Sequence, residues 1–251
     1  MTRAIVRSLP NSFANALSAV APEPPISVAL ARQQHRAYCD VLGELGASLT
    51  VLPADEASPD CVFVEDTAVI AGGVALITRP GAPSRQAEPG IVAAALAAHL
   101  EIARMAAPAT LDGGDCMRLG TTIYVGRSAR TNDAGISRLA QVFATRGLRV
   151  VPVELPAGVL HLKCVVSPLG ADRVLLAEGS LDPGLFPHPV IVPTAETYAA
   201  NAVAIGSRVI VAEGFPRTLE VLSAAGFTPH PVPTSEVRKA DGSLTCQSLI
   251  W

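Results

Sequence analysis

The sequence has few charged residues and no large excess of either sign. Charged residues make up 16% of its 251 residues, and 19 lysines and arginines stand against 22 aspartates and glutamates, a formal net charge of -3. A nucleic-acid-binding domain usually carries a basic stripe that neutralises phosphates, and this sequence has none. We therefore expect no nucleic acid among its partners.

Long apolar runs are also missing. The longest strongly apolar stretch, residues 90–100, is too short to span a bilayer. The first residues, MTRAIVRSLP, lack the apolar stretch of a secretion signal. We therefore expect a soluble, cytoplasmic protein with no membrane partner.

Cysteines are few, and their spacing is not that of pairs. There are five, an odd number with no CxxC motif, which argues against a disulfide framework or a zinc site. Cys39, Cys61, Cys116 and Cys164 are interpreted as small apolar core residues with reduced thiols. Cys246 lies in the apolar run GSLTCQSLIW. It is either one more buried hydrophobe or a nucleophile held by a strand that closes the fold.

The sequence does contain a weak repeat. Each copy has a short strand ending near a proline, a polar loop, an apolar strand, a turn, another strand and often a helix, at a spacing of about 40 to 50 residues. The copies are residues 47–80, 103–132, 148–179, 188–214 and 227–251. The last copy stops after one strand, and residues 4–10 supply what it lacks if the units close into a ring. A strand that completes a closed sheet system does not fray.

Segments with apolar residues at helical spacing lie between these units and predict helices. These segments are residues 28–46, 84–100, 131–147 and 215–226. Gly147 and Gly226 follow two of them, as C-capping glycines do. No linker rich in proline or serine divides the chain, so we expect a single α/β domain over residues 1–251.

Chemically versatile side chains occupy equivalent places in the repeat, just before or at the start of the inner apolar strand. They are Glu65, Asp66, Asp112, His161, Asn201 and Cys246. Each has a plain structural interpretation by itself, since Asp-Gly in LDGGD is a turn signal and HLKC reads as a half-buried strand. In a closed ring, however, equivalent positions converge on the central axis. Their joint placement favours one shared cavity.

Six motifs in order carry a resemblance to a known family. They are FVEDTAVI, ALITRPGAPSR, LDGGD, GRSARTN, HLKCVVS and GSLTC. They resemble the motifs of dimethylarginine dimethylaminohydrolases, which belong to the pentein superfamily together with arginine deiminase. The resemblance spans nearly the whole chain. It implies a five-bladed α/β propeller of ββαβ repeats around a central active-site channel, with no metal and no cofactor.

The resemblance also implies catalytic roles for three residues. Cys246 is the nucleophile, His161 is the general acid and base, and Asp112 is the carboxylate that orients the guanidinium or the histidine. Some relatives have glutamate where this chain has Asp112, and the shorter side chain keeps the charge but reaches a different point. The thiol of a free cysteine, with a pKa of about 8.5, is mostly protonated at neutral pH. A nearby His161 cation or the positively charged substrate can each favour the thiolate.

Substrate-binding residues are implied in the same way. Glu65 and Asp66 are pocket carboxylates, and Asp66 is the better candidate for a direct guanidinium contact. Arg85 and Arg130 hold the substrate α-carboxylate. The α-amino group is bound by Asp60 together with the backbone carbonyls near Leu17 and Ala240, and the loop before Leu17 is a candidate lid.

The expected partner is a small guanidine amino acid. The expected reaction is hydrolysis of an N-methylated arginine to citrulline and dimethylamine or methylamine, through a covalent thiouronium on Cys246. Two alternatives stay open, namely an arginine deiminase or related guanidine hydrolase, and a catalytically silent guanidine-binding module. The oligomeric state stays open between a monomer and a homodimer.

Overall fold

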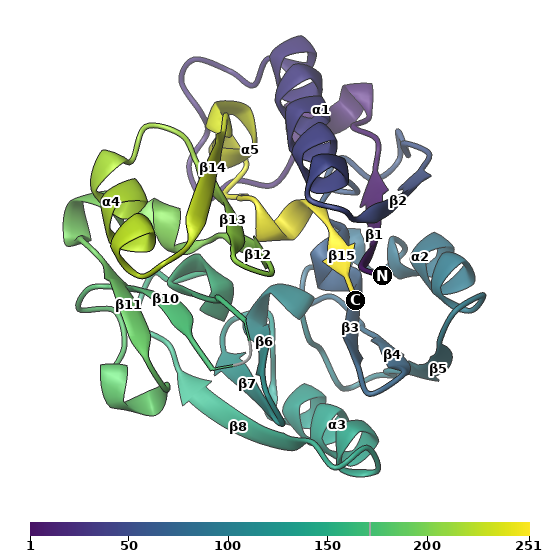
Figure 1. Cartoon of the computed structure of the whole chain (residues 1–251). Coiled ribbons are helices and arrows are strands. Elements are labelled where there is room, and N and C mark those ends of the chain that lie inside the picture. The colour runs from purple at the N-terminus through teal and green to yellow at the C-terminus, as the bar shows by residue number, and fades with distance from the viewer. Residues whose placement is uncertain (171) are drawn as a thin grey trace.

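The structure is a computed structural model that describes residues 1–170 and 172–251. Over these ranges the chain forms five sheets of three strands each, arranged in a ring (Figure 1). In every sheet the first strand pairs antiparallel with the second, and the second pairs parallel with the third. The predicted α/β propeller of five repeats is therefore confirmed.

The strands share a common pattern of burial. The first strands are β3 (Ala68–Ala71), β6 (Cys116–Leu119), β9 (Val166–Pro168), β12 (Val203–Ile205) and β15 (Leu249–Ile250). The second are β4 (Val74–Ile77), β7 (Thr122–Arg127), β10 (Val174–Ala177), β13 (Arg208–Ala212) and β1 (Arg3–Arg7). The third are β5 (Glu101–Arg104), β8 (Arg149–Glu154), β11 (Pro189–Val192), β14 (Thr228–Val232) and β2 (Ser48–Leu52). The second strands are the most buried, because they are covered on both faces, and they accordingly read as continuous apolar runs.

The ring closes through the two ends of the described chain. Strand β15 pairs antiparallel with β1, with Ile250 opposite Ala4 and Leu249 opposite Ile5. The expectation that the first residues complete the last unit is confirmed. The boundaries of the predicted copies are offset by one strand, however. The strand that opens each copy, such as β2 or β5, pairs with the sheet of the preceding unit.

Four helices join the second and third strands of their sheets. They are α1 (Val28–Glu44), α2 (Pro89–Leu96), α3 (Asp133–Ala144) and α4 (Pro216–Ala224). Helix α2 is shorter than predicted because Pro89 lacks an amide N–H and is tolerated in the first helical turn but not in the interior. Gly147 and Gly226 take left-handed φ angles of 70° and 88° after their helices, as expected. No helix in the described ranges is both long enough and apolar enough to cross a membrane.

Shorter helices complete the described elements, and the repeat is not uniform in them. The short α5 (Ser235–Lys239) was not predicted. The 3₁₀ helices are η1 (Asn11–Asn15), η2 (Val64–Thr67), η3 (Pro83–Arg85), η4 (Gly113–Asp115), η5 (Leu162–Cys164), η6 (Pro183–Leu185), η7 (Thr194–Ala200) and η8 (Thr245–Gln247). Between β10 and β11, η6 takes the place that an α-helix has in the other four sheets.

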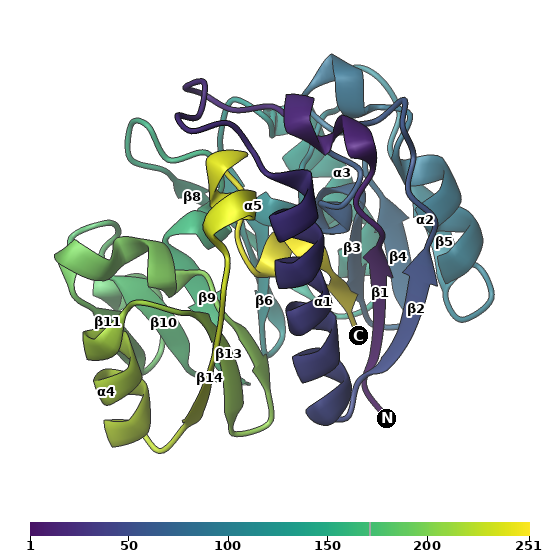
Figure 2. The same cartoon turned by 90° about the horizontal axis from the view of Figure 1, so that it is seen from above.

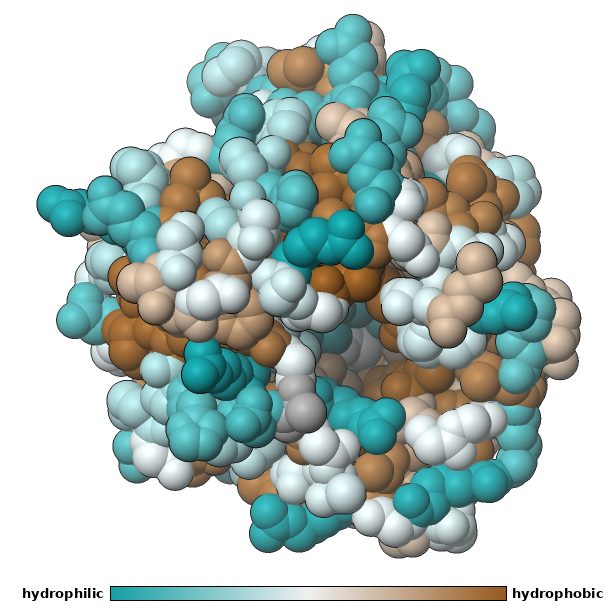
Figure 3. Space-filling view, viewed as in Figure 1, coloured by the Kyte–Doolittle hydropathy of each residue, from teal (hydrophilic) through white to brown (hydrophobic). Residues whose placement is uncertain are grey.

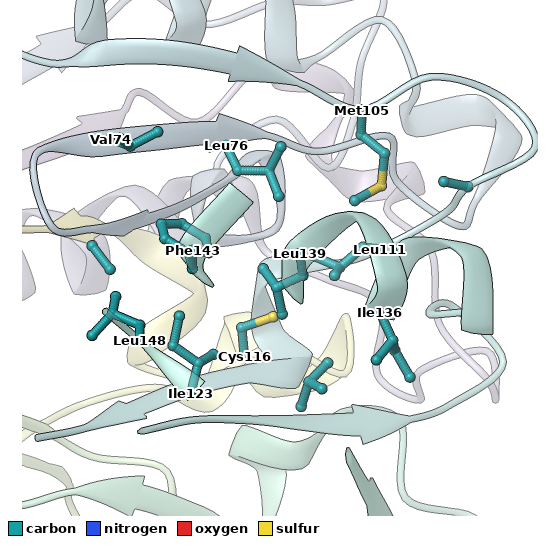
Figure 4. Packing of buried hydrophobic residues seen from close by; sticks show 13 residues of the cluster. Val74, Leu76, Met105, Leu111, Cys116, Ile123, Ile136, Leu139, Phe143 and Leu148 are labelled. Carbon is teal, nitrogen blue, oxygen red and sulfur yellow. The ribbon is translucent and has the colours of Figure 1, made fainter. Parts of the chain in front are cut away.

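Apolar side chains fill the space between neighbouring sheets. In Figure 4, Leu139 and Phe143 of α3 pack with Leu76 of β4 and Ile123 of β7, and all four are fully buried. Burying one such side chain contributes roughly 1.5–3 kcal/mol. Cys116 belongs to the same cluster. The core therefore holds adjacent sheets rigidly, and with them the turns that face the channel.

The remaining cysteines divide by burial. All five cysteines carry free thiols, and Cys61 is buried like Cys116. Cys39 and Cys164 are only half-buried, as is Cys246. The interpretation as core residues therefore fits Cys61 and Cys116 better than the other two.

Candidate active site

Five 3₁₀ helices stand at the inner ends of the sheets. Helices η2, η4, η5, η7 and η8 each precede the first strand of a sheet. Helix η2 contacts η4 and η8, and η5 contacts η4 and η7. Asp66 lies in η2, Asp112 and His161 are the N-cap residues of η4 and η5, and Cys246 lies in η8. Equivalent positions in the repeat therefore do converge, although they are far apart in sequence.

These side chains share a cavity of about 200 Å³ at one end of the channel. Its walls include all of the predicted site residues except Glu65, namely Leu17, Asp60, Asp66, Arg85, Asp112, Arg130, His161, Ala240 and Cys246. The loop after η1 and helix α5 lie at this end of the molecule, whereas both chain termini lie at the other (Figure 2).

Two carboxylates and an imidazole meet in this cavity. His161 Nε2 lies 3.0 Å from Asp112 Oδ2, and the Gly81 amide donates to Asp112 Oδ1 at 2.8 Å. Asp66 Oδ1 accepts from the Gly114 amide at 2.9 Å. A polar atom of each of the three side chains lies within 4.8 Å of the others. Such an arrangement suits a planar cation that offers several N–H groups.

The second glycine of LDGGD explains how the group packs so closely. A Cβ atom at Gly114 would lie 2.7 Å from His161 Nδ1 and 2.9 Å from Asp66 Oδ1, closer than real Cβ contacts. Any side chain at this position would push the imidazole or the carboxylate away. The Asp-Gly pattern is therefore a close approach of backbone to site groups as well as a turn.

Burial and charge set the protonation of the site. Burial by itself lowers the pKa of His161, but the carboxylates of Asp66, Asp112 and Asp115 raise it to about 9. Burial raises the pKa of the Cys246 thiol well above its usual value, and Glu65 and Asp66 raise it further. Burial opposes ionisation of Asp66, yet His161 and Arg85 bring its pKa below the usual value. At neutral pH the site thus holds a neutral thiol, an imidazolium and an ionised Asp66.

The same set of Asp66, Asp112 and His161 offers ligand atoms at a spacing that suits a metal ion. A metal needs a neutral imidazole nitrogen, whereas the carboxylates raise the pKa of His161 to about 9. Binding a divalent cation at neutral pH would therefore first require His161 to lose its proton. An organic cation that donates hydrogen bonds needs no such change.

A separate network fixes the turn that carries Cys246. The side chain of Asn201 accepts from the Thr245 amide at 2.9 Å and donates to Thr245 Oγ1 at 3.0 Å. Thr245 Oγ1 then donates to Glu65 Oε2 at 2.7 Å. On the other side of the cysteine, Gln247 Oε1 lies 2.9 Å from Nδ1 of the buried His35. Asn201, at the equivalent point of its own unit, holds the cysteine turn and does not line the cavity.

Glu65 lies on the other side of the cavity floor from its neighbour Asp66. Its Oε1 accepts from Lys163 Nζ at 2.6 Å, and both side chains are largely buried. This pair lines a second cavity of about 570 Å³, which opens in the hollowed centre of the face in Figure 3. The structure therefore does not bring Glu65 together with the other predicted pocket residues, and its direct contact with a substrate stays a prediction.

The two predicted arginines differ in their surroundings. Arg85 is buried and donates to Asp66 at 2.6 Å, to Glu88 at 2.8 Å and to the Phe63 carbonyl at 2.9 Å. Arg130 is half-buried at the cavity wall. Within the described ranges, its guanidinium takes part in no ion pair with a protein carboxylate. Arg130 is therefore the freer cation for a substrate anion.

A polar contact links the loop after η1 to the cavity wall. Asp60 is buried, and its Oδ1 accepts from the Leu17 amide at 3.0 Å. Leu17 itself is 40% exposed. Two residues further on, the Ala19 amide donates to Asp241 Oδ2 at 2.6 Å, next to Ala240. Two carboxylates thus hold this loop over the mouth of the cavity, where a lid would be needed.

Sequence reasoning missed several residues that support the site. Asp115 is fully buried behind His161, Lys163 neutralises Glu65, and Glu88 holds Arg85. Asp115 belongs to the LDGGD motif and Lys163 to the HLKC motif, so the motifs could have indicated both residues as part of the site. The Leu162 partner of Asp115 lies 47 residues away in the sequence and the Glu65 partner of Lys163 lies 98 residues away, and only the folded ring reveals those contacts.

Comparison with known proteins gives a consistent result. A family model described as arginine deiminase matches residues 56–197. A protein of Streptomyces coelicolor named N(G),N(G)-dimethylarginine dimethylaminohydrolase is 40% identical, over 98% of this chain and 96% of its own length. The protein of the same name from Pseudomonas aeruginosa is 38% identical over 88% of each chain.

Solved structures agree with these sequence matches. A cysteine-to-serine variant of the Pseudomonas aeruginosa enzyme, complexed with citrulline, superposes with a TM-score of 0.94 at 35% identity, over 99% of this chain and 98% of that one. The N-terminal domain of a cyanobacterial arginine dihydrolase has a TM-score of 0.88 at 19% identity, which indicates the fold alone. The sequence motifs, the ring of five sheets and these matches together lead to one conclusion: the chain belongs to the dimethylarginine dimethylaminohydrolase family.

Proposed function

We propose that this protein hydrolyses the guanidinium group of N-methylated arginine, giving citrulline and dimethylamine or methylamine. The observation that carries the proposal is the shared cavity that Cys246 lines together with His161, Asp112 and Asp66. The name of the Streptomyces coelicolor relative and the citrulline bound to the Pseudomonas aeruginosa enzyme support the same substrate class.

Asp66 and Asp112 bind the guanidinium. They are buried carboxylates close to the imidazole of His161, and paired carboxylates bind a planar cation through several charge-assisted hydrogen bonds. The contacts fix the central carbon of the guanidinium relative to the sulfur of Cys246. Positioning of this kind converts a slow bimolecular attack into an intramolecular one.

The substrate itself helps to ionise the nucleophile. The pKa of the Cys246 thiol is raised by burial and by the charges of Glu65 and Asp66, so the empty cavity favours the thiol. An arriving guanidinium puts a positive charge beside the sulfur and lowers that pKa. The reactive thiolate is thereby formed mainly in the presence of a substrate.

His161 moves the protons of both chemical steps. The Cys246 sulfur forms a bond to the guanidinium carbon, and the bond from that carbon to the methylated nitrogen breaks while His161 protonates the departing amine. Water then attacks the thiouronium carbon, neutral His161 accepts its proton, and the carbon–sulfur bond breaks. The urea group of citrulline results, and Cys246 is regenerated.

Recognition of the amino-acid end is divided among several groups. Arg130 binds the α-carboxylate, because its guanidinium lies at the cavity wall without a protein carboxylate partner among the described residues. Arg85 adds to the positive potential there while its guanidinium holds Asp66. Asp60 and the carbonyls of Leu17 and Ala240, which line the same cavity, receive the α-amino group.

This division predicts different effects for the two arginines. Arg130→Ala should lower kcat/KM for a methylated arginine by roughly ten- to a hundredfold while leaving its decarboxylated counterpart nearly unaffected, since that compound never used the contact. Arg85→Ala should lower kcat/KM for both compounds and lower the Tm, because it releases Asp66 and leaves Glu88 unpaired. Steady-state kinetics on both compounds give the ratio of the two kcat/KM values for each variant.

An exposed arginine at the other cavity provides the control. Arg118→Ala removes a charge from the wall of that cavity and should leave kcat/KM unchanged for both substrates. If Arg130→Ala reduced kcat/KM for both substrates by the same factor, Arg130 would not be the group that binds the α-carboxylate.

An assay for the ureido product across four guanidines tests the reaction itself, and for the three arginines that product is citrulline. We expect citrulline from monomethyl-arginine and asymmetric dimethylarginine, with much less from arginine, and little turnover of agmatine, which lacks the carboxylate. Faster turnover of arginine than of both methylated forms would instead favour the arginine deiminase reaction, the description of the matching family model. Binding without product would indicate a silent guanidine-binding module.

We further propose that the protein works in the cytoplasm as a single domain. Five free thiols suit a reducing compartment. The pairing of β15 with β1 links the last unit to the first, so no unit can be separated without opening the ring.

A further inference from the structure

Asp115 is a buried carboxylate that no step of the reaction uses. It is the last residue of LDGGD, and it has no exposed surface. Its Oδ2 accepts from the hydroxyls of Ser128 and Thr131, both at 2.6 Å, and its Oδ1 accepts from the Leu162 amide at 3.0 Å. Both oxygens act only as acceptors, as an ionised carboxylate does.

Each of these three donors leads to a different site residue. Ser128 Oγ also accepts from the Arg130 amide at 3.0 Å. Thr131 Oγ1 also accepts from the Asp112 amide at 3.2 Å. Leu162 follows His161 directly, at the start of η5.

The direction of the hydroxyl hydrogens matters for this network. A hydroxyl has one proton, so Ser128 and Thr131 can each accept from a backbone amide with a free lone pair while their protons point at Asp115. Asp115 therefore fixes the orientation of both hydroxyls. Chains of this kind polarise one another and hold their members more firmly than separate bonds would.

Asp115 also lies close enough to His161 to affect it electrostatically. Burial raises the pKa of Asp115, while the charge of His161 and the two hydroxyl donors oppose that rise. In return, the carboxylate is one of the groups that raise the pKa of His161. Asp66 and Asp112 act on the imidazole in the same direction.

We propose that Asp115 is the positioning residue of this active site, a single anchor that sets the places of Asp112, His161 and Arg130 through Thr131, Leu162 and Ser128. The proposal rests on the proposed function for the roles of those three residues. One side chain thus aligns the end of the cavity that binds the guanidinium with the end that binds the α-carboxylate.

Replacing Asp115 by asparagine is the first test. Asp115→Asn keeps the size but replaces one acceptor oxygen by an amino group, so either the two hydroxyls or the Leu162 amide loses its acceptor. We expect kcat/KM for a methylated arginine to fall by roughly ten- to a hundredfold. The alkaline limb of the kcat/KM profile should move to lower pH, because His161 loses a neighbouring negative charge and so releases its proton more readily.

A second buried carboxylate in another unit provides a matched control. Glu196 accepts from the Arg217 amide, the Thr218 amide and Thr218 Oγ1 and lines neither cavity. Glu196→Gln should lower the Tm as Asp115→Asn does, yet leave kcat/KM and its pH profile unchanged. If both variants lost activity only in proportion to the drop in Tm, Asp115 would be a structural residue and the proposal would be overturned.

The branches can be cut one at a time, which keeps the test decisive even if Asp115→Asn does not fold. Ser128→Ala should raise KM for a methylated arginine with kcat nearly kept, and should spare its decarboxylated counterpart, because this branch leads to Arg130. Thr131→Val should lower kcat for both compounds, because its branch leads to Asp112. Identical effects of Ser128→Ala and Thr131→Val would contradict a separate branch to each residue.

Alkylation of Cys246 by a haloamidine gives a readout that does not need turnover. The pH profile of the labelling rate reports the thiol and the imidazole, and Asp115→Asn should shift it in the same direction as the kinetic profile. If the wild-type protein were alkylated yet released no citrulline, the proposed function would fail while the labelling shift still decided the role of Asp115. An unshifted labelling profile would count against Asp115 alone.

Discussion

Cys246→Ser is expected to abolish turnover while leaving substrate binding largely intact. Serine keeps the shape of the side chain, but its hydroxyl has no accessible anion near neutral pH, and a guanidinium carbon needs a strong nucleophile. Loss of a nucleophile that acts as one unit with its acid–base partner lowers kcat by about three orders of magnitude or more. Calorimetric titration with a methylated arginine and a citrulline assay measure the two properties separately.

The half-buried Cys39 supplies a matched variant. It lies on α1, lines neither cavity and carries a free thiol. Its sulfur lies 3.6 Å from Nε2 of His35, a contact that a serine hydroxyl can keep, so Cys39→Ser should retain normal turnover. Loss of activity in both serine variants would point to a general sensitivity of the fold to cysteine replacement. Residual activity of more than a few per cent in Cys246→Ser would remove Cys246 from the role of nucleophile.

His161→Ala should be nearly as damaging, for a different reason. The thiol remains, but the amine has no proton donor and water has no base, so both chemical steps slow. Added imidazole, or a substrate with a more acidic leaving group, should restore part of the rate. The exposed His99 is the control, and His99→Ala should leave the rate of turnover unchanged. A nearly normal rate in His161→Ala would make the residue structural.

The same residue sets the expected response to pH. The carboxylates raise the pKa of His161 to about 9, so the imidazolium needed to protonate the amine is present at neutral pH and is lost as the pH rises through that value. The wild-type kcat/KM should therefore fall above pH of about 9, because kcat/KM reports the ionisation of the free enzyme. This limb should be absent from the residual rate of His161→Ala.

The fold was predictable because its signal is repeated. Each unit contains the same order of apolar strands and turns, so several weak copies reinforce one another where a single one would not. The offset of one strand arises because a short strand such as β5 looks alike whether it ends one sheet or begins the next. Pairing between strands is a non-local property, and the periodicity of one segment does not specify it.

The residues of the candidate site were predictable to the extent that each motif contains a single chemically versatile side chain, while their roles stay predictions. Cys246, His161 and Asp112 could be selected from motifs, whereas the pairing of Arg85 with Asp66 could not, because Asp66 lies 19 residues before it in the sequence. Glu65 and Asp66 show the limit most clearly. They are neighbours in the sequence and alike in chemistry, and only the turn of η2 sends them to different cavities.

The position of Cys246 along the chain has a consequence for how the protein is made. Asp66, Asp112 and His161 precede it, and so does every strand of the described ranges other than β15. A ribosome that adds residues in order, with earlier units folding first, completes the carboxylates and the imidazole before it supplies either the sulfur or the strand that seals the ring. If Cys246 is the nucleophile as proposed, a nascent or prematurely ended chain has none, and catalysis begins only when the last unit joins the first.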